Sequence, residues 1–284
     1  MCHSHFGLLC VILTVISTAS KTEAFQGLYN GKLTSITNSP YSAAITNNYF
    51  DIICNGVLIR VDIVLTAAHC LHSIPNVRVV TGITRYAIEG LTGVEQFSNV
   101  KALYYHKQWN VNDQDRYYDI AAIRLAAPIK ISIWQRPIGL PDRPPPNDVY
   151  AKVSGWGTYG DNREISDNLR ELDVCLIDIG YCQKLKMFKV QFYHICTRRD
   201  DGWKTCVGAN GSPLVYNDTL LGLATGGVEC EVGAPGLFTS TYHVKDFINE
   251  VFRRIKDFYF SMYGFMVKNS LVLYDILPFY NNKL

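Results

Sequence analysis

Residues 61–70 read VDIVLTAAHC, and the pattern around this stretch decides the fold. The apolar run Val61–Thr66 predicts a short β-strand, which two alanines, His69 and Cys70 follow. Further outward, Gly, Asn, Asp and Pro residues separate more runs of this kind, at 57–59, 77–81, 120–125 and 220–224. Strands this short and this regularly interrupted favour antiparallel β-barrels over alternating strands and helices.

A connector, a hairpin and a helix add to this all-β pattern. The proline-rich segment 142–147 (DRPPPN) is typical of a stiff surface connector between two halves. Asn217-Asp218 lies between two apolar runs and predicts a hairpin turn. From Val244 to Met262, apolar residues recur at three-to-four spacing, which predicts an amphipathic helix. An extra apolar C-terminal tail follows this helix.

Length and composition fit one large exported domain. The 284 residues, 48% of them hydrophobic, suit a single all-β unit. A net charge of +2 without a dense Lys/Arg run gives no reason to expect nucleic-acid binding. Residues 6–17 (FGLLCVILTVIS) form an apolar core too short to span a bilayer with margin. We therefore predict a signal peptide over residues 1–24 and a secreted protein, with a retained membrane anchor as the alternative.

Four segments resemble the chymotrypsin-like (S1, trypsin-like) serine protease family. They are Leu65–Cys70 (LTAAHC), Asp119–Leu125 (DIAAIRL), Ser154–Gly157 (SGWG) and Gly208–Pro213 (GANGSP). In that family they supply the catalytic histidine, the aspartate that orients it, the turn opening the second barrel and the nucleophile loop. The resemblance covers about residues 28–252. It implies two antiparallel six-stranded β-barrels in residues 25–252 and a helical, apolar extension over 253–284.

The nucleophile is missing from the pattern that the resemblance implies. The family reads Gly-Asp-Ser-Gly-Gly-Pro, so Asn210 replaces the serine and Ala209 replaces the aspartate. An amide carries no hydroxyl for a histidine to deprotonate, so we expect no active catalytic residue. His69 and Asp119 then remain as a structural hydrogen-bonded pair, with a residual acid–base role as the alternative. Gly208 and Asn210 would supply the backbone of the former oxyanion hole, and Ser212 is the alternative nucleophile.

The resemblance also places an altered activation switch and an altered pocket. In the family, the aspartate that Ala209 replaces pairs with an α-amino group freed by cleavage. The corresponding segment here, 28–31 (LYNG), is preceded by glycine rather than by a basic residue. Lys204 falls at the floor of the specificity pocket, and Gly227 and Gly236 fall at its walls. Lys204 would accept an acidic group or reach solvent.

The cysteines indicate a disulfide-bonded exported chain. Cys2 and Cys10 lie in the predicted signal peptide, and the seven that remain of nine predict three bridges and one leftover. Cys175 is the leftover by resemblance, either as a small buried thiol or as a link to a partner chain. None shows the Cys-x-x-Cys spacing of a zinc site, and we expect no metal and no cofactor. The bridges implied by the resemblance are Cys54–Cys70, Cys182–Cys196 and Cys206–Cys230.

The sequence also contains two N-glycosylation sequons and an apolar C-terminal tail. Asn217 begins Asn-Asp-Thr on the predicted turn, so we expect a glycan there. Asn210 begins Asn-Gly-Ser, but Pro213 follows and the resemblance places this loop in the cleft, so we expect no glycan there. Polar and charged residues such as Lys268 and Asp275 argue against a spanning helix in the tail. We expect the tail to pack on its own domain or to be partly disordered, with an interfacial segment or a docking element as alternatives.

The sequence thus predicts an inactive serine protease homologue that acts by binding. Its expected role is a binding protein, cofactor, decoy or scaffold for another secreted protein, such as an active protease or a second homologue. Proteins of this kind occur in seminal fluid and haemolymph, as the family resemblance implies. The alternatives are a serine-type hydrolase that uses Ser212 and a membrane-associated module that uses the tail.

Overall fold

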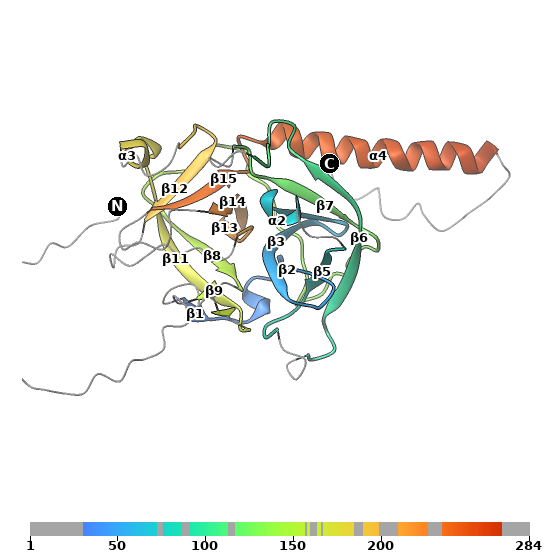
Figure 1. The fold of residues 1–284 in the computed structure, drawn as a ribbon, viewed down its shortest axis with the longest axis horizontal. Helices are drawn as coiled ribbons and strands as arrows, with labels where there is room; N and C mark the ends of the chain where they lie inside the picture. Colours follow the sequence, from blue (N-terminus) through green and yellow to red (C-terminus); the bar gives the residue numbers. More distant parts are fainter. Residues whose placement is uncertain are drawn as a thin grey trace, which may run out of the picture. The chain divides into compact units, whose positions relative to one another are not determined.

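The protein folds into two β-barrels followed by a long helix (Figure 1). The computed structural model describes residues 31–72, 76–86, 91–112, 117–156, 158–159, 164–165, 167–184, 190–198, 210–226 and 235–268. The chain divides after Val244 into two compact units, and the first unit contains both barrels. The all-β architecture and the two six-stranded antiparallel barrels predicted from the sequence are confirmed.

The first barrel closes in the order β2-β3-β4-β7-β6-β5. Its apolar interior comes from fully buried side chains such as Ile45, Leu58 and Ile123. Because β2 pairs with both β3 and β5, no strand edge is left open. Its strands are β2 (Ser42–Thr46), β3 (Ile52–Arg60), β4 (Ile63–Thr66), β5 (Arg78–Thr81), β6 (Gln96–Tyr105) and β7 (Ala121–Leu125).

The second barrel closes because β8 pairs with both β11 and β13. Val153, Leu172 and Phe238 are among the fully or nearly fully buried residues of its core. The short strand β1 (Lys32–Leu33) adds to the edge of β11, and β9 (Thr158–Tyr159) pairs with β10 (Glu164–Ile165). The strands of this barrel are β8 (Tyr150–Gly155), β11 (Arg170–Ile177), β12 (His194–Arg198), β13 (Pro213–Tyr216), β14 (Thr219–Gly226) and β15 (Gly236–Ser240).

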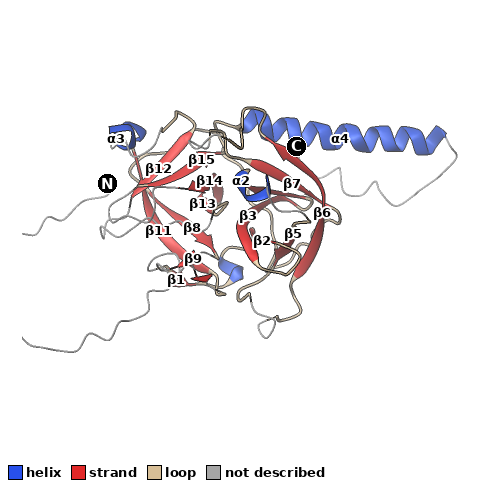
Figure 2. Ribbon diagram, viewed as in Figure 1, coloured by secondary structure: helices blue, strands red, loops and turns tan. Residues whose placement is uncertain are grey.

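The helices, shown in blue in Figure 2, are few. The short ones are η1 (Ile36–Asn38), α2 (His69–His72) and α3 (Ile179–Lys184). The predicted amphipathic helix is confirmed as α4 (Lys245–Lys268), in which Phe247, Ile248, Val251 and Ile255 are buried at three-to-four spacing. No helix among the described residues combines the length and the apolar character that crossing a membrane requires.

The hairpin predicted at Asn217-Asp218 is confirmed. Both residues have positive φ, 47° and 55°, as a two-residue type I′ turn requires, and β13 and β14 flank them. The predicted connector 142–147 lies in the strand-free stretch between β7 and β8. Local turn chemistry therefore determines the hairpin.

Asn55 joins the two barrels through hydrogen bonds to the backbone of Trp156. Its side-chain amide donates to the Trp156 carbonyl at 3.1 Å, and its side-chain oxygen accepts from the Trp156 N–H at 2.8 Å. Around this link, Ala44 and Val80 of the first barrel share a buried apolar cluster with Trp156 and Leu169. Because these polar groups are buried and paired, they fix how the barrel ends meet.

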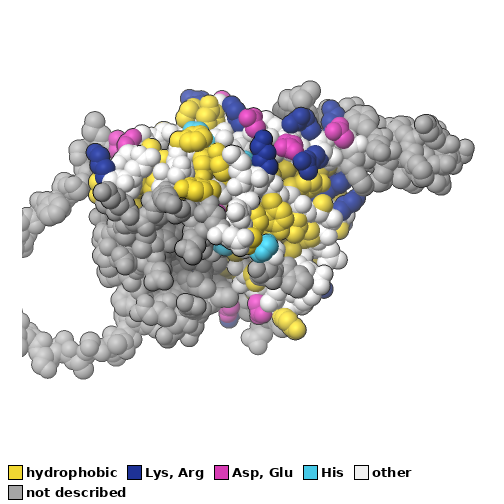
Figure 3. Space-filling view, turned by 45° about the horizontal axis from the view of Figure 1, so that its top comes forward, with side chains coloured by type: hydrophobic (Ala, Val, Ile, Leu, Met, Phe, Trp, Pro, Cys, Tyr) yellow, Lys and Arg dark blue, Asp and Glu magenta, His cyan; other side chains and the backbone are white. Residues whose placement is uncertain are grey.

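The surface carries charges of both signs. In Figure 3, Lys and Arg side chains lie beside Asp and Glu side chains along the upper edge, and hydrophobic side chains form separate patches below. No broad region of one sign is visible on the part of this face that the structure describes.

Candidate functional site

Strand pairing in the first barrel brings His69 and Asp119 together. β4 and β7 are antiparallel neighbours, with Thr66 opposite Ala121. His69 follows Thr66 by three residues and begins α2, while Asp119 precedes Ala121 by two. Two side chains 50 residues apart in sequence thus meet at one end of the barrel.

The pair is held by two hydrogen bonds. Nδ1 of His69 lies 2.6 Å from Oδ2 of Asp119, and the backbone N–H of His69 donates to Oδ1 at 2.9 Å. The carboxylate is fully buried, whereas the imidazole ring is 24% exposed. A buried carboxylate requires such partners, and the bond to Nδ1 fixes the orientation of the ring. The structure therefore brings together the two residues that the resemblance paired. We call this pair the His69–Asp119 corner.

Two aromatic rings stack on Tyr118, the residue before Asp119, and the sequence analysis missed them. Tyr118 has a positive φ of 49° and stacks on His106 at 4.3 Å and on Tyr193 at 4.0 Å between ring centroids. Thr239 donates from its hydroxyl to the Asp119 carbonyl at 3.5 Å. A positive φ is uncommon for tyrosine, and the two stacked rings stabilise Tyr118 in this backbone conformation. The only sequence signal was the position of Tyr118 beside the aspartate.

His194 is a second histidine near Asp119 that sequence reasoning missed. Burial lowers the pKa of His194 to about 4, and the negative charge of Asp119 opposes this shift. Its Nδ1 accepts a hydrogen bond from the backbone N–H of Gln191 at 3.1 Å. His194 is therefore neutral near pH 7 and occupies the interior as a polar core residue.

The turn at Asn210 and Gly211 is tied to the first barrel. The Asn210 carbonyl accepts a hydrogen bond from the backbone N–H of Asn55 at 2.8 Å, and the Gly211 N–H donates to the Ala224 carbonyl at 2.7 Å. Gly211 has a φ of 80°, and a Cβ there would lie 2.0 Å from the Asn55 carbonyl oxygen. Only glycine fits this position.

Ser212, the alternative nucleophile, is fully buried. Its hydroxyl lies so close to Gly155 that a Cβ on Gly155 would come within 2.5 Å of it, and it forms no hydrogen bond with any residue that the structure describes. A nucleophile must reach both a base and a substrate, and a side chain without exposed surface reaches no substrate from solvent.

Several predicted site residues fall outside the described residues. They are Lys204, Cys206, Gly208, Ala209, Gly227 and Cys230, and the predicted signal peptide also lies there. Gly236 is described: it is buried at the start of β15, opposite Thr197 of β12. Asn217 is exposed at the tip of its hairpin, where an attached glycan would meet no protein interior.

Two predicted disulfides are present, and one expectation about Cys175 is wrong. Cys54 is bonded to Cys70 and Cys182 to Cys196, with Cα atoms 6.0 and 6.4 Å apart. Cys175 was expected to be unpaired, but it is disulfide-bonded, and its partner lies outside the described residues. Because Cys175 is fully buried in the middle of β11, a separate chain has no access to it.

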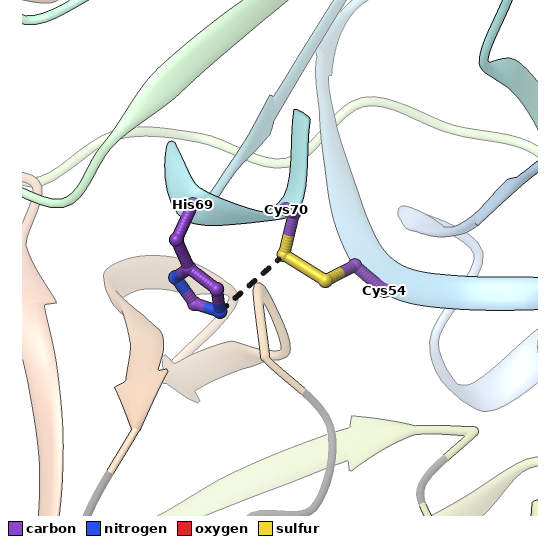
Figure 4. A group of neighbouring side chains, drawn as sticks. All are labelled: Cys54, His69 and Cys70. Carbon is purple, nitrogen blue, oxygen red and sulfur yellow. Dashed lines mark hydrogen bonds between the residues drawn. A yellow bond between two sulfur atoms is a disulfide. The ribbon is translucent and has the colours of Figure 1, made fainter. Parts of the chain in front are cut away.

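One group of side chains has the spacing of a metal site but not its chemistry. Cys54, His69 and Cys70 lie close together, and Nε2 of His69 is 3.9 Å from the Cys70 sulfur (Figure 4). Both sulfurs belong to the disulfide, so neither is a thiolate that could bind a cation. Nδ1 of the histidine is engaged by Asp119. These residues do not fit a metal ion.

Comparisons with known proteins agree with this geometry. The family described as "Trypsin" matches residues 28–248. The chain is 31% identical to a trypsin of Sarcophaga bullata, over 80% of this chain and 90% of that protein. It is 29% identical to trypsin iota of Drosophila melanogaster, over 84% and 93%. Among solved structures, neuropsin, a serine protease of mouse brain, superposes with a TM-score of 0.72 at 26% identity, covering 78% of this chain and 99% of that one. The family match, the paired barrels and the His69–Asp119 corner together show that this chain belongs to the trypsin family.

Proposed function

We propose that this protein is a secreted, catalytically inactive member of the trypsin family that acts by binding another secreted protein. The observation that carries the proposal is Asn210, which stands where the family resemblance places the nucleophilic serine. The primary amide of asparagine has no hydroxyl group, so His69 has no nucleophile to deprotonate at this position.

The burial of Ser212 supports the same proposal. A hydrolase that lacked the usual serine would need another nucleophile within reach of both substrate and base. Ser212 is the nearest hydroxyl along the loop, and it has no exposed surface. The alternative function, a serine-type hydrolase using Ser212, therefore has little structural support.

The retained His69–Asp119 corner is compatible with inactivity. Asp119 is fully buried, and its carboxylate accepts two hydrogen bonds from His69. Removing either partner would leave a buried polar group unpaired, which costs stability whether or not catalysis occurs. The pair can therefore persist for structural reasons.

The predicted signal peptide and the disulfides support the proposed secretion. The described chain carries bridges at Cys54–Cys70 and Cys182–Cys196, and such bonds persist in oxidising compartments. We infer that the partner is also extracellular. Candidate partners are an active protease or another inactive homologue, for which this protein would serve as a cofactor, decoy or scaffold.

Hydrolysis of peptide esters by the purified full-length protein tests inactivity. We expect no turnover, and no covalent labelling by a fluorophosphonate at any serine. Variants Ser212→Ala and His69→Ala should leave this background unchanged. Turnover that disappears in His69→Ala, or a label mapped to Ser212, would overturn the proposal.

A restoration experiment measures how much of the catalytic apparatus remains. The double variant Asn210→Ser/Ala209→Asp restores the two family residues, and Asn217→Ser serves as a matched control in an exposed turn. Labelling of the double variant alone would show that His69 and Asp119 still form a competent base. Labelling of the control or of the parent would contradict the proposed inactivity.

A further inference from the structure

An aromatic hollow lies on the first barrel, apart from the residues of the corner. It has a volume of about 610 Å³ and is open to solvent. Its walls include the side chains of Tyr49, Phe50, Tyr86 and Phe97, together with Arg78. The loop between β2 and β3 contributes two of these residues, and the neighbouring strands β5 and β6 contribute Arg78 and Phe97 (Figure 1).

The aromatic residues of the hollow are unusually exposed. Tyr49 is 86% exposed, Phe97 49% and Phe50 43%. Phe50 and Phe97 contact each other edge to face, with ring centroids 6.2 Å apart. Contiguous exposed aromatic surface of this kind is uncommon on a monomeric protein, and Tyr and Phe are enriched at protein interfaces relative to the rest of the surface.

The loop that carries Tyr49 and Phe50 is held rigidly by Asn47. The Asn47 side-chain oxygen accepts from the N–H groups of Tyr49 at 2.8 Å and Asp51 at 2.9 Å, and its amide donates to the Asp51 carboxylate at 2.9 Å. Phe50 has a positive φ of 64°, a strained conformation for a bulky residue. These bonds restrain the backbone of the loop, and the contacts of Phe50 with Phe97 and Arg78 orient the Phe50 ring before any partner arrives, which lowers the entropy cost of binding.

Arg78 gives the hollow a single positive charge. Its guanidinium lies 5.0 Å from the centre of the Phe50 ring. It is the one charged side chain among the described residues that line the hollow, and no carboxylate in the described part of the chain forms an ion pair with it. An apolar surface with one cation complements an apolar ligand with one anion.

We propose that this hollow docks an extended segment of a partner protein in which a carboxylate stands next to an aromatic or aliphatic side chain. The apolar side chain would pack between Phe50 and Phe97, and the carboxylate would pair with Arg78. The volume lies within the range of ligand pockets and accommodates a few side chains rather than a folded domain. This proposal rests on the proposed binding role and names the surface that performs it.

Selection of peptides tests the proposal without knowledge of the natural partner. A displayed library of random peptides of about 12 residues is selected on the full-length protein at physiological salt. We expect the enriched peptides to place Asp or Glu within one or two residues of Phe, Tyr, Trp or Leu. Synthetic copies should bind the Arg78→Glu and Phe97→Ser variants at least about tenfold more weakly, the effect of losing a hot-spot residue.

Matched controls separate the hollow from the rest of the surface. Arg143→Glu changes an exposed arginine and Phe192→Ser an exposed phenylalanine, neither of which lines the hollow. Both should bind the peptides like the parent protein. A peptide in which Lys replaces the acidic residue should regain binding to Arg78→Glu, because the charges are exchanged. Circular dichroism should show that all four variants remain folded.

Other outcomes overturn the proposal. These are a library that enriches no sequence, peptides that bind Arg78→Glu as well as the parent, and a consensus without an acidic residue. Sedimentation that detects a dimer sensitive to Phe97→Ser would assign the hollow to a second copy, and flotation with anionic vesicles lost in that variant would assign it to lipid. Because binding is measured without catalysis, esterase activity would contradict the proposed inactivity and leave the peptide result intact.

Discussion

The His69–Asp119 corner and the aromatic hollow belong to the same barrel and differ in how they place polar and apolar groups. In the corner, a fully buried carboxylate accepts two hydrogen bonds from one histidine. In the hollow, the rings of Tyr49, Phe50 and Phe97 are exposed, and no described carboxylate pairs with Arg78. The buried carboxylate of the corner thus has its hydrogen-bond partners within the protein, whereas the aromatic rings of the hollow remain exposed to solvent.

This difference teaches which region the fold itself requires. Altering the corner exposes an unpaired buried group, so selection for stability alone would retain it in an inactive protein. The rings of the hollow contribute less to folding than buried rings do, because Phe50 and Phe97 keep about half of their surface in contact with water and Tyr49 keeps most of it. A fixed arrangement of such rings around one cation is therefore better explained by a ligand than by stability.

Gly211→Ala should produce the largest loss of stability. Gly211 is buried in the turn that contacts Asn55 of the first barrel. The new Cβ would lie 2.0 Å from the Asn55 carbonyl oxygen, at a residue with a φ of 80°. Backbone strain and the clash together should lower the free energy of unfolding by roughly 4 kcal/mol. Urea denaturation measures the change.

Gly93→Ala is the matched control for Gly211→Ala. Gly93 also has a positive φ, 86°, but a Cβ there would meet no atom within 4 Å. Its cost should be only the strain, about 1 kcal/mol. Equal losses in the two variants would show that the contact between the turn and β3 contributes nothing.

Asp119→Ala should be the next largest effect. The backbone N–H and the ring of His69 would both lose their acceptor, at a cost of about 3 kcal/mol in the free energy of unfolding. Phe97→Ser in the hollow, where about half of the side chain is already exposed, should lower the same quantity by less, about 1 kcal/mol. Similar losses in the two variants would remove the contrast between the corner and the hollow.

The dependence of stability on pH tests whether His194 stays unprotonated in the folded protein. His194 has a folded pKa of about 4, below its unfolded value of 6.5. Between these values the unfolded chain binds a proton that the folded chain does not, so stability falls as the pH drops from 6.5 to 4. The total loss should approach about 3 kcal/mol.

Urea midpoints measured at intervals from pH 7 to pH 4 give this loss, and His194→Leu is the comparison. The variant removes the titrating group, so its midpoint should fall less over the same interval. A variant with the same pH dependence as the parent would place the proton uptake at another residue.

Much of the fold and the central pair could be predicted from the sequence, because both depend on local patterns. The apolar strand ending in Thr66 and the strand that begins after Asp119 pair in the expected way, so His69 and Asp119 meet. The turn at Asn217-Asp218 follows from the tolerance of those residues for positive φ. Each signal lies within a few consecutive residues.

What the sequence did not predict depends on contacts between distant segments. Tyr193 reaches Tyr118 from the end of the loop before β12, and no spacing rule connects the two. The disulfide of Cys175 was missed because the family resemblance implied no partner for this cysteine. Likewise, Phe50 and Phe97 look like scattered surface residues until the barrel places their rings together.

Asn47→Ala should have a small effect on stability and a clear effect on binding. It removes three side-chain hydrogen bonds that hold the exposed loop at 47–51, which should lower the free energy of unfolding by about 1 kcal/mol. Tyr49 and Phe50 would then sample several arrangements, and peptides selected on the parent should bind several-fold more weakly. Asn110→Ala is the control, because Asn110 accepts one hydrogen bond in a turn that does not line the hollow. Both rings remain present in Asn47→Ala, so weaker binding would be caused by the loss of their arrangement. Undiminished binding would show that the hollow forms around its ligand and that the loop conformation plays no part in recognition.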